Sequence, residues 1–351
     1  MPYAKPIFQR VALAGLALCL SLLVAETAAR VLRLGPSVYD LSTRWFQFSH
    51  LPGVDYEFRP GVAYGTGFIN DDSMRDLPRN VEKPDGVYRI ACIGDSICAG
   101  LGVAAGETFS RVWERSLRDR GVAAEVLNFG VPGYALRHIL AALHARTLKY
   151  DPDMVVYAFC LNDAQEESYE LEALKHLLSP AQRDFYQRTR GAAGTLLSRS
   201  RLYNLVRYGV ASLRQPAEPA PAPKPEDDPQ FAAIRAGAGA GYFRGLYQSE
   251  ARRALLAEGF LEFAALADEH GFTAVVAIFP VSGRVGSGLE AVYEFIAETA
   301  TDAGLHLVDL RAAFKAAGGD RLFADPLHPN ARGHRVAAEA LDRELSSMVP
   351  Q

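Results

Sequence analysis

The chain has 351 residues and a formal net charge of −4, from 37 Lys and Arg residues against 41 Asp and Glu residues. This length suits one large globular domain with attachments, and the scattered basic residues form no stripe, so we expect no nucleic-acid partner. The cysteines have neither the spacing of a zinc site nor the pattern of a disulfide framework.

An apolar run near the N-terminus predicts a membrane helix. Residues 11–25, VALAGLALCLSLLVA, carry no charge and follow Lys5 and Arg10. A positive segment before an apolar core is typical of a secretory signal or a signal anchor. The run is short for a span of about 20 residues, but counting from Ile7 brings it near that length. The best cleavage site, Thr27-Ala28-Ala29, is poor and favours an uncleaved anchor.

The positive residues lie on the N-terminal side of this run, which predicts that the N-terminus stays inside and the rest is exported. We expect residues 1–34 to form a cytoplasmic stub and a signal anchor. This arrangement describes a single-pass protein of the cell inner membrane with an extracytoplasmic, periplasmic domain. The alternative is a protein secreted after signal cleavage.

The remaining chain divides into two parts. Residues 35–86 are rich in Pro, Gly and aromatic residues, and we predict an irregular lead-in that packs on the following domain. In the domain, residues 87–351, strand patterns alternate with helical patterns, which predicts a three-layer α/β/α fold with a flavodoxin-like parallel sheet of about five strands. The predicted helices cover about 109–117, 136–143, 242–270, 289–303 and 330–345, and the predicted strands cover 88–93, 125–129, 154–160, 273–279 and 305–309.

One region breaks the alternation. Residues 165–241 form an insertion after the third predicted strand, with helical patterns and a Pro/Ala-rich linker at 215–230 that should be extended. The insertion leaves from the carboxyl edge of the sheet, where sites form in such folds. It is therefore interpreted either as a lid or substrate-binding cap, or as a surface excursion with no catalytic role.

Candidate catalytic residues come directly after the first three predicted strands. Ser96 ends the run Ile93-Gly94-Asp95-Ser96, where glycine permits a sharp turn and the serine begins a helix. Gly133 and Asn162 follow the next two strands and offer a backbone N–H and a side-chain amide. The alternatives are an N-cap serine, a turn glycine with Gly130 as competitor, and a capping asparagine.

A base and its partner stand near the C-terminus. Asp325 and His328 are three residues apart in a predicted turn, so the carboxylate can hold one tautomer while the other ring nitrogen faces Ser96. The alternative is an ordinary loop histidine, and His334 in the following helix is the nearest rival. A thiol nucleophile, Cys98 or Cys160, is a minor alternative to the serine.

These ordered blocks resemble the SGNH hydrolases, also called the GDSL esterase/lipase family, over residues 87–346 apart from the insertion. The resemblance implies Ser96 as nucleophile, His328 as base and Asp325 as its orienting carboxylate. It also implies an oxyanion hole made by the N–H groups of Ser96 and Gly133 and the side chain of Asn162. The family has glycine where this chain has Cys160.

The lead-in, with Ile69-Asn70 and Arg75, resembles that of the membrane-anchored bacterial branch, which is often linked to modification of cell-surface polysaccharides. We therefore expect a serine esterase that removes short acyl groups, chiefly acetyl, from an extracytoplasmic polysaccharide. Its partners would be an acylated carbohydrate or another small ester, and the membrane. No metal or organic cofactor is needed.

Two other functions stay open. An O-acyltransferase would use the same triad on an exported glycan, because water and a sugar hydroxyl attack an acyl-enzyme alike. A catalytically idle glycan-binding or assembly module is the third, although the intact triad argues against it. For either enzyme, no long apolar segment near Ser96, Gly133, Asn162 or the Asp325–His328 pair would line a lipid tunnel.

Overall fold

The computed structural model describes residues 4–32, 34, 38, 41–166, 168–178, 182–183, 186, 200–212, 223–224 and 227–350. Most of the predicted linker at 215–230 lies outside these residues. The chain divides into two compact units, one comprising Met1–Leu41 with Lys175–Pro221 and the other Ser42–Leu174 with Ala222–Gln351. Each unit is described by itself.

The first unit contains a long apolar helix. Helix α1 spans Ala4–Val31, and its segment Phe8–Val31 has a mean hydropathy of 2.1. Among the described residues, this is the one helix long and apolar enough to cross a membrane. Near its end, the Glu26 carboxylate accepts hydrogen bonds from the backbone N–H groups of Arg201 and Leu202, which begin helix α8 (Arg201–Ser212). Glu26 thus caps α8 from another helix.

The second unit is built on a parallel five-stranded sheet in the order β6-β5-β7-β8-β9. The strands lie close to the predicted ones, because each is a short apolar run that is buried on both faces. They span Ala124–Asn128 (β6), Tyr88–Gly94 (β5), Met154–Phe159 (β7), Thr273–Ile278 (β8) and His306–Asp309 (β9).

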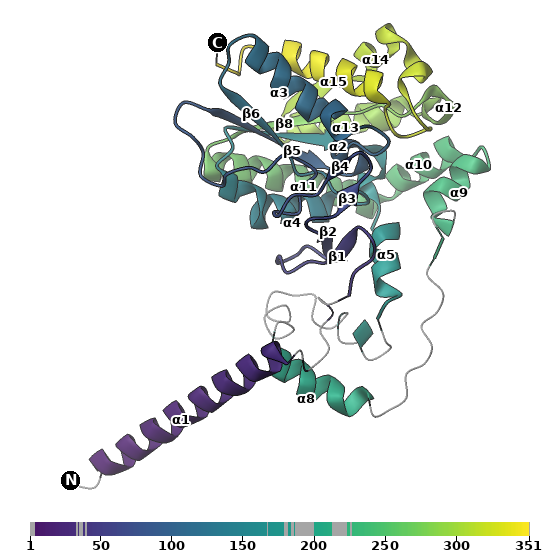
Figure 1. Ribbon diagram of the computed structural model, residues 1–351. Helices are drawn as coiled ribbons and strands as arrows, with labels where there is room; N and C mark the ends of the chain where they lie inside the picture. The colour runs from purple at the N-terminus through teal and green to yellow at the C-terminus, as the bar shows by residue number, and fades with distance from the viewer. Residues whose placement is uncertain are drawn as a thin grey trace. The chain divides into compact units, whose positions relative to one another are not determined.

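Helices cover both faces of this sheet, which confirms the three-layer fold (Figure 1). Alternate strand residues such as Cys92, Val156 and Ala277 share a core with the helices of one layer. That layer is α3 (Phe109–Asp119), α14 (Arg311–Ala317) and α15 (Ala331–Glu344), and the opposite layer is α4 (Leu136–Ala145), α11 (Glu250–His270) and α13 (Glu290–Asp302).

Two elements differ from the prediction. The single helix predicted over 242–270 is two helices, α10 (Gly239–Gln248) and α11. The break comes at Ser249, whose hydroxyl accepts a hydrogen bond from the N–H of Arg252 and starts a new helix. Helix α14 was not predicted, because its seven residues show too little apolar periodicity.

The lead-in contains two short antiparallel hairpins that the sequence pattern did not predict. The first pairs β1 (Phe46–Phe48) with β2 (Tyr56–Phe58), and the second pairs β3 (Ala63–Tyr64) with β4 (Gly67–Phe68). Aromatic contacts hold the first hairpin, since the rings of Phe46 and Phe58 stack with centroids 5.2 Å apart. Strands this short depend on such packing for their stability.

The lead-in also supports the start of the site. The Arg75 side chain is buried and donates hydrogen bonds to the carbonyl oxygens of Ala99 (2.7 Å) and Val103 (2.7 Å). These carbonyls end the four-residue helix α2 (Ser96–Ala99) and the turn after it. An arginine clamp therefore fixes the segment that carries Ser96.

Candidate active site

Ser96 lies at the first turn after β5, at the carboxyl edge of the sheet. Gly94 has a φ of +153°, and a Cβ there would come within 2.9 Å of the carbonyl oxygen of Ala158. Only glycine fits this close turn. The Asp95 carboxylate then caps α2 by accepting a hydrogen bond from the N–H of Ile97 at 2.9 Å. The turn brings the hydroxyl of Ser96 to the surface of a pocket.

His328 and Asp325 meet this hydroxyl from the other end of the chain. The Nε2 atom of His328 lies 2.9 Å from Ser96 Oγ, and its Nδ1 atom lies 2.7 Å from Asp325 Oδ2. The other carboxylate oxygen of Asp325 accepts hydrogen bonds from the N–H groups of Leu327 and His328. With Nδ1–H donating to a carboxylate, the unprotonated Nε2 faces the serine.

The charge state of Asp325 suits this arrangement. Burial alone would raise the pKa of its carboxyl. The hydrogen bond and charge of His328, together with two backbone N–H groups, lower this pKa by more than burial raises it. The pKa of Asp325 therefore lies below its usual value, and the carboxylate is ionised at neutral pH. An ionised partner stabilises the imidazolium that forms when His328 accepts a proton.

Asn162 is joined to Ser96 through a residue whose role the sequence did not reveal. Asp95 Oδ2 accepts a hydrogen bond from the Asn162 amide (2.9 Å) and lies 3.1 Å from Ser96 Oγ. The Asn162 oxygen in turn accepts from the thiol of Cys160 at 2.6 Å. One N–H of the Asn162 amide therefore meets Asp95, and the amide oxygen meets Cys160.

The structure separates the two candidate glycines. The N–H of Gly130 donates to the Asn128 side chain at 3.0 Å, and a Cβ at Gly130 would overlap the backbone of α2. Gly130 therefore serves close packing. Gly133 has a φ of +74° and lines the same pocket as Ser96. Within the residues that the structure describes, its N–H has no backbone acceptor.

Tyr56 from the lead-in holds the peptide that carries this N–H. Its hydroxyl donates to the carbonyl oxygen of Pro132 at 2.7 Å and accepts from the Ser168 hydroxyl at 3.0 Å. The Pro132 carbonyl and the Gly133 N–H belong to one planar peptide, so fixing the first orients the second. No motif marks Tyr56, because its role depends on a contact 76 residues away in sequence.

The other candidates for nucleophile and base are buried in structural positions. Cys98 and Cys160 are 0% and 2% exposed, and burial raises the pKa of both thiols well above its usual value, which opposes the thiolate. His334 is buried, and its Nδ1 accepts a hydrogen bond from the N–H of Phe109. Burial lowers the pKa of His334 to about 3, as expected for a neutral core histidine.

Ser96, Gly133, Asn162 and His328 line one cavity of about 410 Å³. Its remaining walls combine aromatic and polar side chains, from the lead-in and from the region predicted as an insertion. They include Trp45, Tyr64, Tyr169, Glu170, Asp228 and Phe231. Within the described ranges, no group of three or more His, Cys, Asp and Glu side chains is arranged to hold a metal ion.

The carboxyl group of Glu170, on helix α5 (Tyr169–Lys175), lies beside Gly133. A Cβ placed on Gly133 would overlap its Oε2 atom. Burial and the nearby charges of Asp228 and Asp95 raise the pKa of Glu170 to about 7, against a smaller lowering by its own backbone and His328. The group therefore changes its charge near neutral pH, beside Gly133, which lines the pocket.

Glu170→Gln is expected to alter the pH dependence of turnover. In the wild type, Glu170 ionises as the pH rises through about 7, and its negative charge opposes an oxyanion forming at Gly133. Glutamine cannot ionise, so the ratio of variant to wild-type kcat should rise about tenfold between pH 6 and pH 8.5. Steady-state kinetics across this range measure the ratio, with the exposed Glu298→Gln on α13 as control. A flat ratio would show that Glu170 does not act on the oxyanion.

Comparisons with known proteins identify a family match that covers most of the chain. The profile of a family described as "GDSL-like Lipase/Acylhydrolase family" matches residues 92–336. No curated protein matches the chain significantly.

Solved structures that resemble the chain include three of low sequence identity. A lipase/acylhydrolase from Enterococcus faecalis is 17% identical, with a TM-score of 0.43 over 75% of this chain and 97% of that one. The structure titled TesA is 15% identical, with a TM-score of 0.43 over 74% and 99% of the two chains. The acetyl xylan esterase AlAXEase is 16% identical, with a TM-score of 0.40 over 73% and 99%. At these scores the matched structures say nothing about substrate.

Proposed function

The chain belongs to the GDSL-like lipase/acylhydrolase family and is an ester hydrolase, and from this premise we propose that Ser96, His328 and Asp325 are its catalytic triad. The observation that carries the proposal is a continuous chain of hydrogen bonds. Ser96 Oγ lies 2.9 Å from His328 Nε2, and His328 Nδ1 lies 2.7 Å from Asp325 Oδ2. Both distances lie within the reach required for proton transfer and for orienting the base.

In the proposed mechanism, Ser96 Oγ attacks the ester carbonyl while His328 Nε2 takes its proton. Asp325 stabilises the resulting imidazolium. The imidazolium then protonates the departing alcohol, which leaves an acyl group on Ser96. Water, deprotonated by His328, attacks this acyl-enzyme. The bond between the acyl group and Ser96 Oγ then breaks, His328 returns the proton to Oγ, and the acid is released.

The negative charge of each tetrahedral intermediate needs donors that are already in place. The N–H groups of Ser96 and Gly133 and the second N–H of the Asn162 amide are proposed for this role. Their positions are supported by the Asp95 capping contact, by the hydrogen bond of Tyr56 to Pro132, and by the Asp95–Asn162 hydrogen bond. Donors fixed before the reaction cost little reorganisation when charge develops.

The proposed substrate is a short acyl ester, chiefly an acetyl ester, on an extracytoplasmic polysaccharide. The pocket mixes aromatic side chains such as Trp45 and Tyr64 with the polar Gln165, Glu170 and Asp228. Aromatic faces suit the C–H surfaces of sugar rings, and the polar groups suit their hydroxyls.

The acyl preference is testable with a series of activated esters. We expect kcat/KM to fall from acetyl to butyryl and to fall by at least about tenfold by octanoyl. A lipid-binding pocket would give the opposite trend, since each buried methylene contributes about 0.8 kcal/mol. A clear octanoyl preference would replace the glycan substrate with a lipid one, while leaving the triad proposal unaffected.

We also propose that α1 anchors the protein in the membrane with the second unit outside the cytoplasm. The support is the apolar helix Phe8–Val31 and the basic Lys5 and Arg10 at its start.

We expect the esterase activity not to require the membrane anchor. A variant lacking residues 1–34 should appear in the soluble fraction and keep its esterase activity, because every proposed site residue lies later in the chain. In the full chain, protease added outside intact spheroplasts should digest a C-terminal tag. A tag protected from external protease would reverse the proposed orientation.

A further inference from the structure

A second cavity adjoins the catalytic pocket. It has a volume of about 350 Å³ and lies between the start of α5, helix α9 (Pro229–Arg235) and helix α10. Four side chains line both cavities: Gln165, Ser168, Tyr169 and Asp228. The two cavities therefore adjoin along these side chains. The size falls in the usual range for small-molecule sites, about 300–1,000 Å³.

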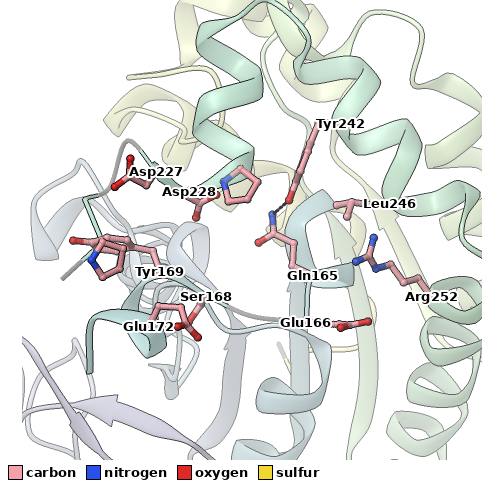
Figure 2. A pocket seen from close by; sticks show the side chains of 12 residues that line it. Gln165, Glu166, Ser168, Tyr169, Glu172, Asp227, Asp228, Tyr242, Leu246 and Arg252 are labelled. Carbon is pink, nitrogen blue, oxygen red and sulfur yellow. Dashed lines mark hydrogen bonds between the residues drawn. The ribbon is translucent and has the colours of Figure 1, made fainter. Parts of the chain in front are cut away.

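The side chains that line this cavity come from two opposite sides of it (Figure 2). Tyr169, Ser168 and Glu172 lie on one side, and Tyr242 from α10 and Arg252 from α11 on the other.

Gln165 stands between the two cavities and is held in place. Its Nε2 atom donates to Tyr242 Oη at 2.9 Å and to Gln230 Oε1 at 3.0 Å. Gln165 is thus a fixed side chain at the edge of both cavities, so it needs little ordering when a ligand binds.

The chemistry of the lining suits an uncharged, hydroxyl-rich ligand. Two tyrosine rings, Tyr169 and Tyr242, offer flat faces, and planar amide and carboxylate groups offer hydrogen-bond partners. The lining includes four carboxylates, Glu166, Glu172, Asp227 and Asp228, against the single cation Arg252. This excess of negative charge repels uronate, phosphate and sulfate groups.

We propose that the second cavity is a subsite for an uncharged sugar residue covalently linked to the acylated one, an inference that rests on the proposed esterase function. The acyl group and its sugar occupy the pocket at Ser96, and the neighbouring sugar contacts Tyr242 and Gln165. The enzyme then gains binding energy from an oligosaccharide that a monosaccharide or a simple ester cannot supply.

The test compares three kinds of acetyl ester with the full-length protein: 4-nitrophenyl acetate, an O-acetylated xyloside, and O-acetylated xylotriose. For the wild type we expect kcat/KM to be at least about tenfold higher for the trisaccharide than for the monosaccharide. Tyr242→Ala should remove most of this advantage, mainly through KM, and leave 4-nitrophenyl acetate unchanged. Tyr242→Phe keeps the ring and should retain most of the advantage.

A second variant tests whether the negative charge of the cavity excludes acidic sugars. Wild-type protein should discriminate against an O-acetylated oligogalacturonate of the same length, and Glu166→Gln/Glu172→Gln should weaken this discrimination. Glu269→Gln, an exposed change elsewhere on α11, is the matched control and should leave it unchanged.

The outcomes separate the two proposals. No hydrolysis of 4-nitrophenyl acetate, or hydrolysis that survives Ser96→Ala, defeats the proposed function. Hydrolysis that depends on Ser96, but with equal kcat/KM for monosaccharide and trisaccharide, overturns the subsite alone. If Tyr242→Ala also loses 4-nitrophenyl acetate activity, the α10 wall has been disturbed. The wild-type ratio and the Glu166→Gln/Glu172→Gln variant then decide the question.

Discussion

Ser96→Ala is expected to lower kcat for an activated acetyl ester by roughly 10⁴–10⁶, the usual loss when a triad nucleophile is removed. The Ser96 hydroxyl is the only oxygen nucleophile placed on His328 Nε2 in the described residues. The nearby thiols of Cys98 and Cys160 are buried, and their raised pKa values keep them protonated. The residual rate should come from the oxyanion donors and binding alone.

The measurement is the rate of acetate release by variant and wild type at equal folded concentration, checked by circular dichroism. Ser282→Ala is the matched control, because Ser282 is a buried serine after β8, and its hydroxyl has no hydrogen-bond partner among the described residues. It should keep full activity. A folded Ser96→Ala protein with wild-type turnover would exclude the serine mechanism.

The sheet could be predicted well because its strands are local signals. Each is a short apolar run between turn residues, and β7 is buried along its whole length. The hairpins of the lead-in escaped prediction for the opposite reason. They are two or three residues long, and their stability comes from ring contacts such as Phe46 with Phe58 and Tyr56 with Tyr134. Such tertiary contacts leave no periodic pattern in sequence.

The residues of the proposed site also differ in whether a local sequence pattern marks them. Ser96 and the Asp325–His328 pair stand in short motifs, and the fold brings them within hydrogen-bond distance. Tyr56 and Glu170 carry no motif. They reach the Pro132-Gly133 turn from the lead-in and from α5, and their nearness follows only from the packed structure. Residues that stand in a local motif, such as Asp325 beside His328, are therefore visible in sequence, whereas residues that reach the site from a distant segment need the fold.

Asp325→Asn is expected to lower kcat by about 10⁴ while leaving the backbone geometry intact. The carboxylate accepts the Nδ1–H of His328 and so keeps Nε2 free of a proton. An asparagine amide at this position can donate to Nδ1 instead. That favours the tautomer with a proton on Nε2, which cannot accept the proton of Ser96. The asparagine oxygen still accepts from the N–H groups of Leu327 and His328, so the turn should hold.

The coupling between these residues gives the decisive measurement. Since Asp325 acts only through His328 on Ser96, the double variant Ser96→Ala/Asp325→Asn should be no slower than Ser96→Ala alone. His328→Ala should match Ser96→Ala in kcat, whereas Asp302→Asn, an exposed change on α13, should have no effect. Burst and steady-state kinetics on an acetyl ester measure all four variants. Additive losses in the double variant would mean that Asp325 acts independently of the serine, and the triad would have to be abandoned.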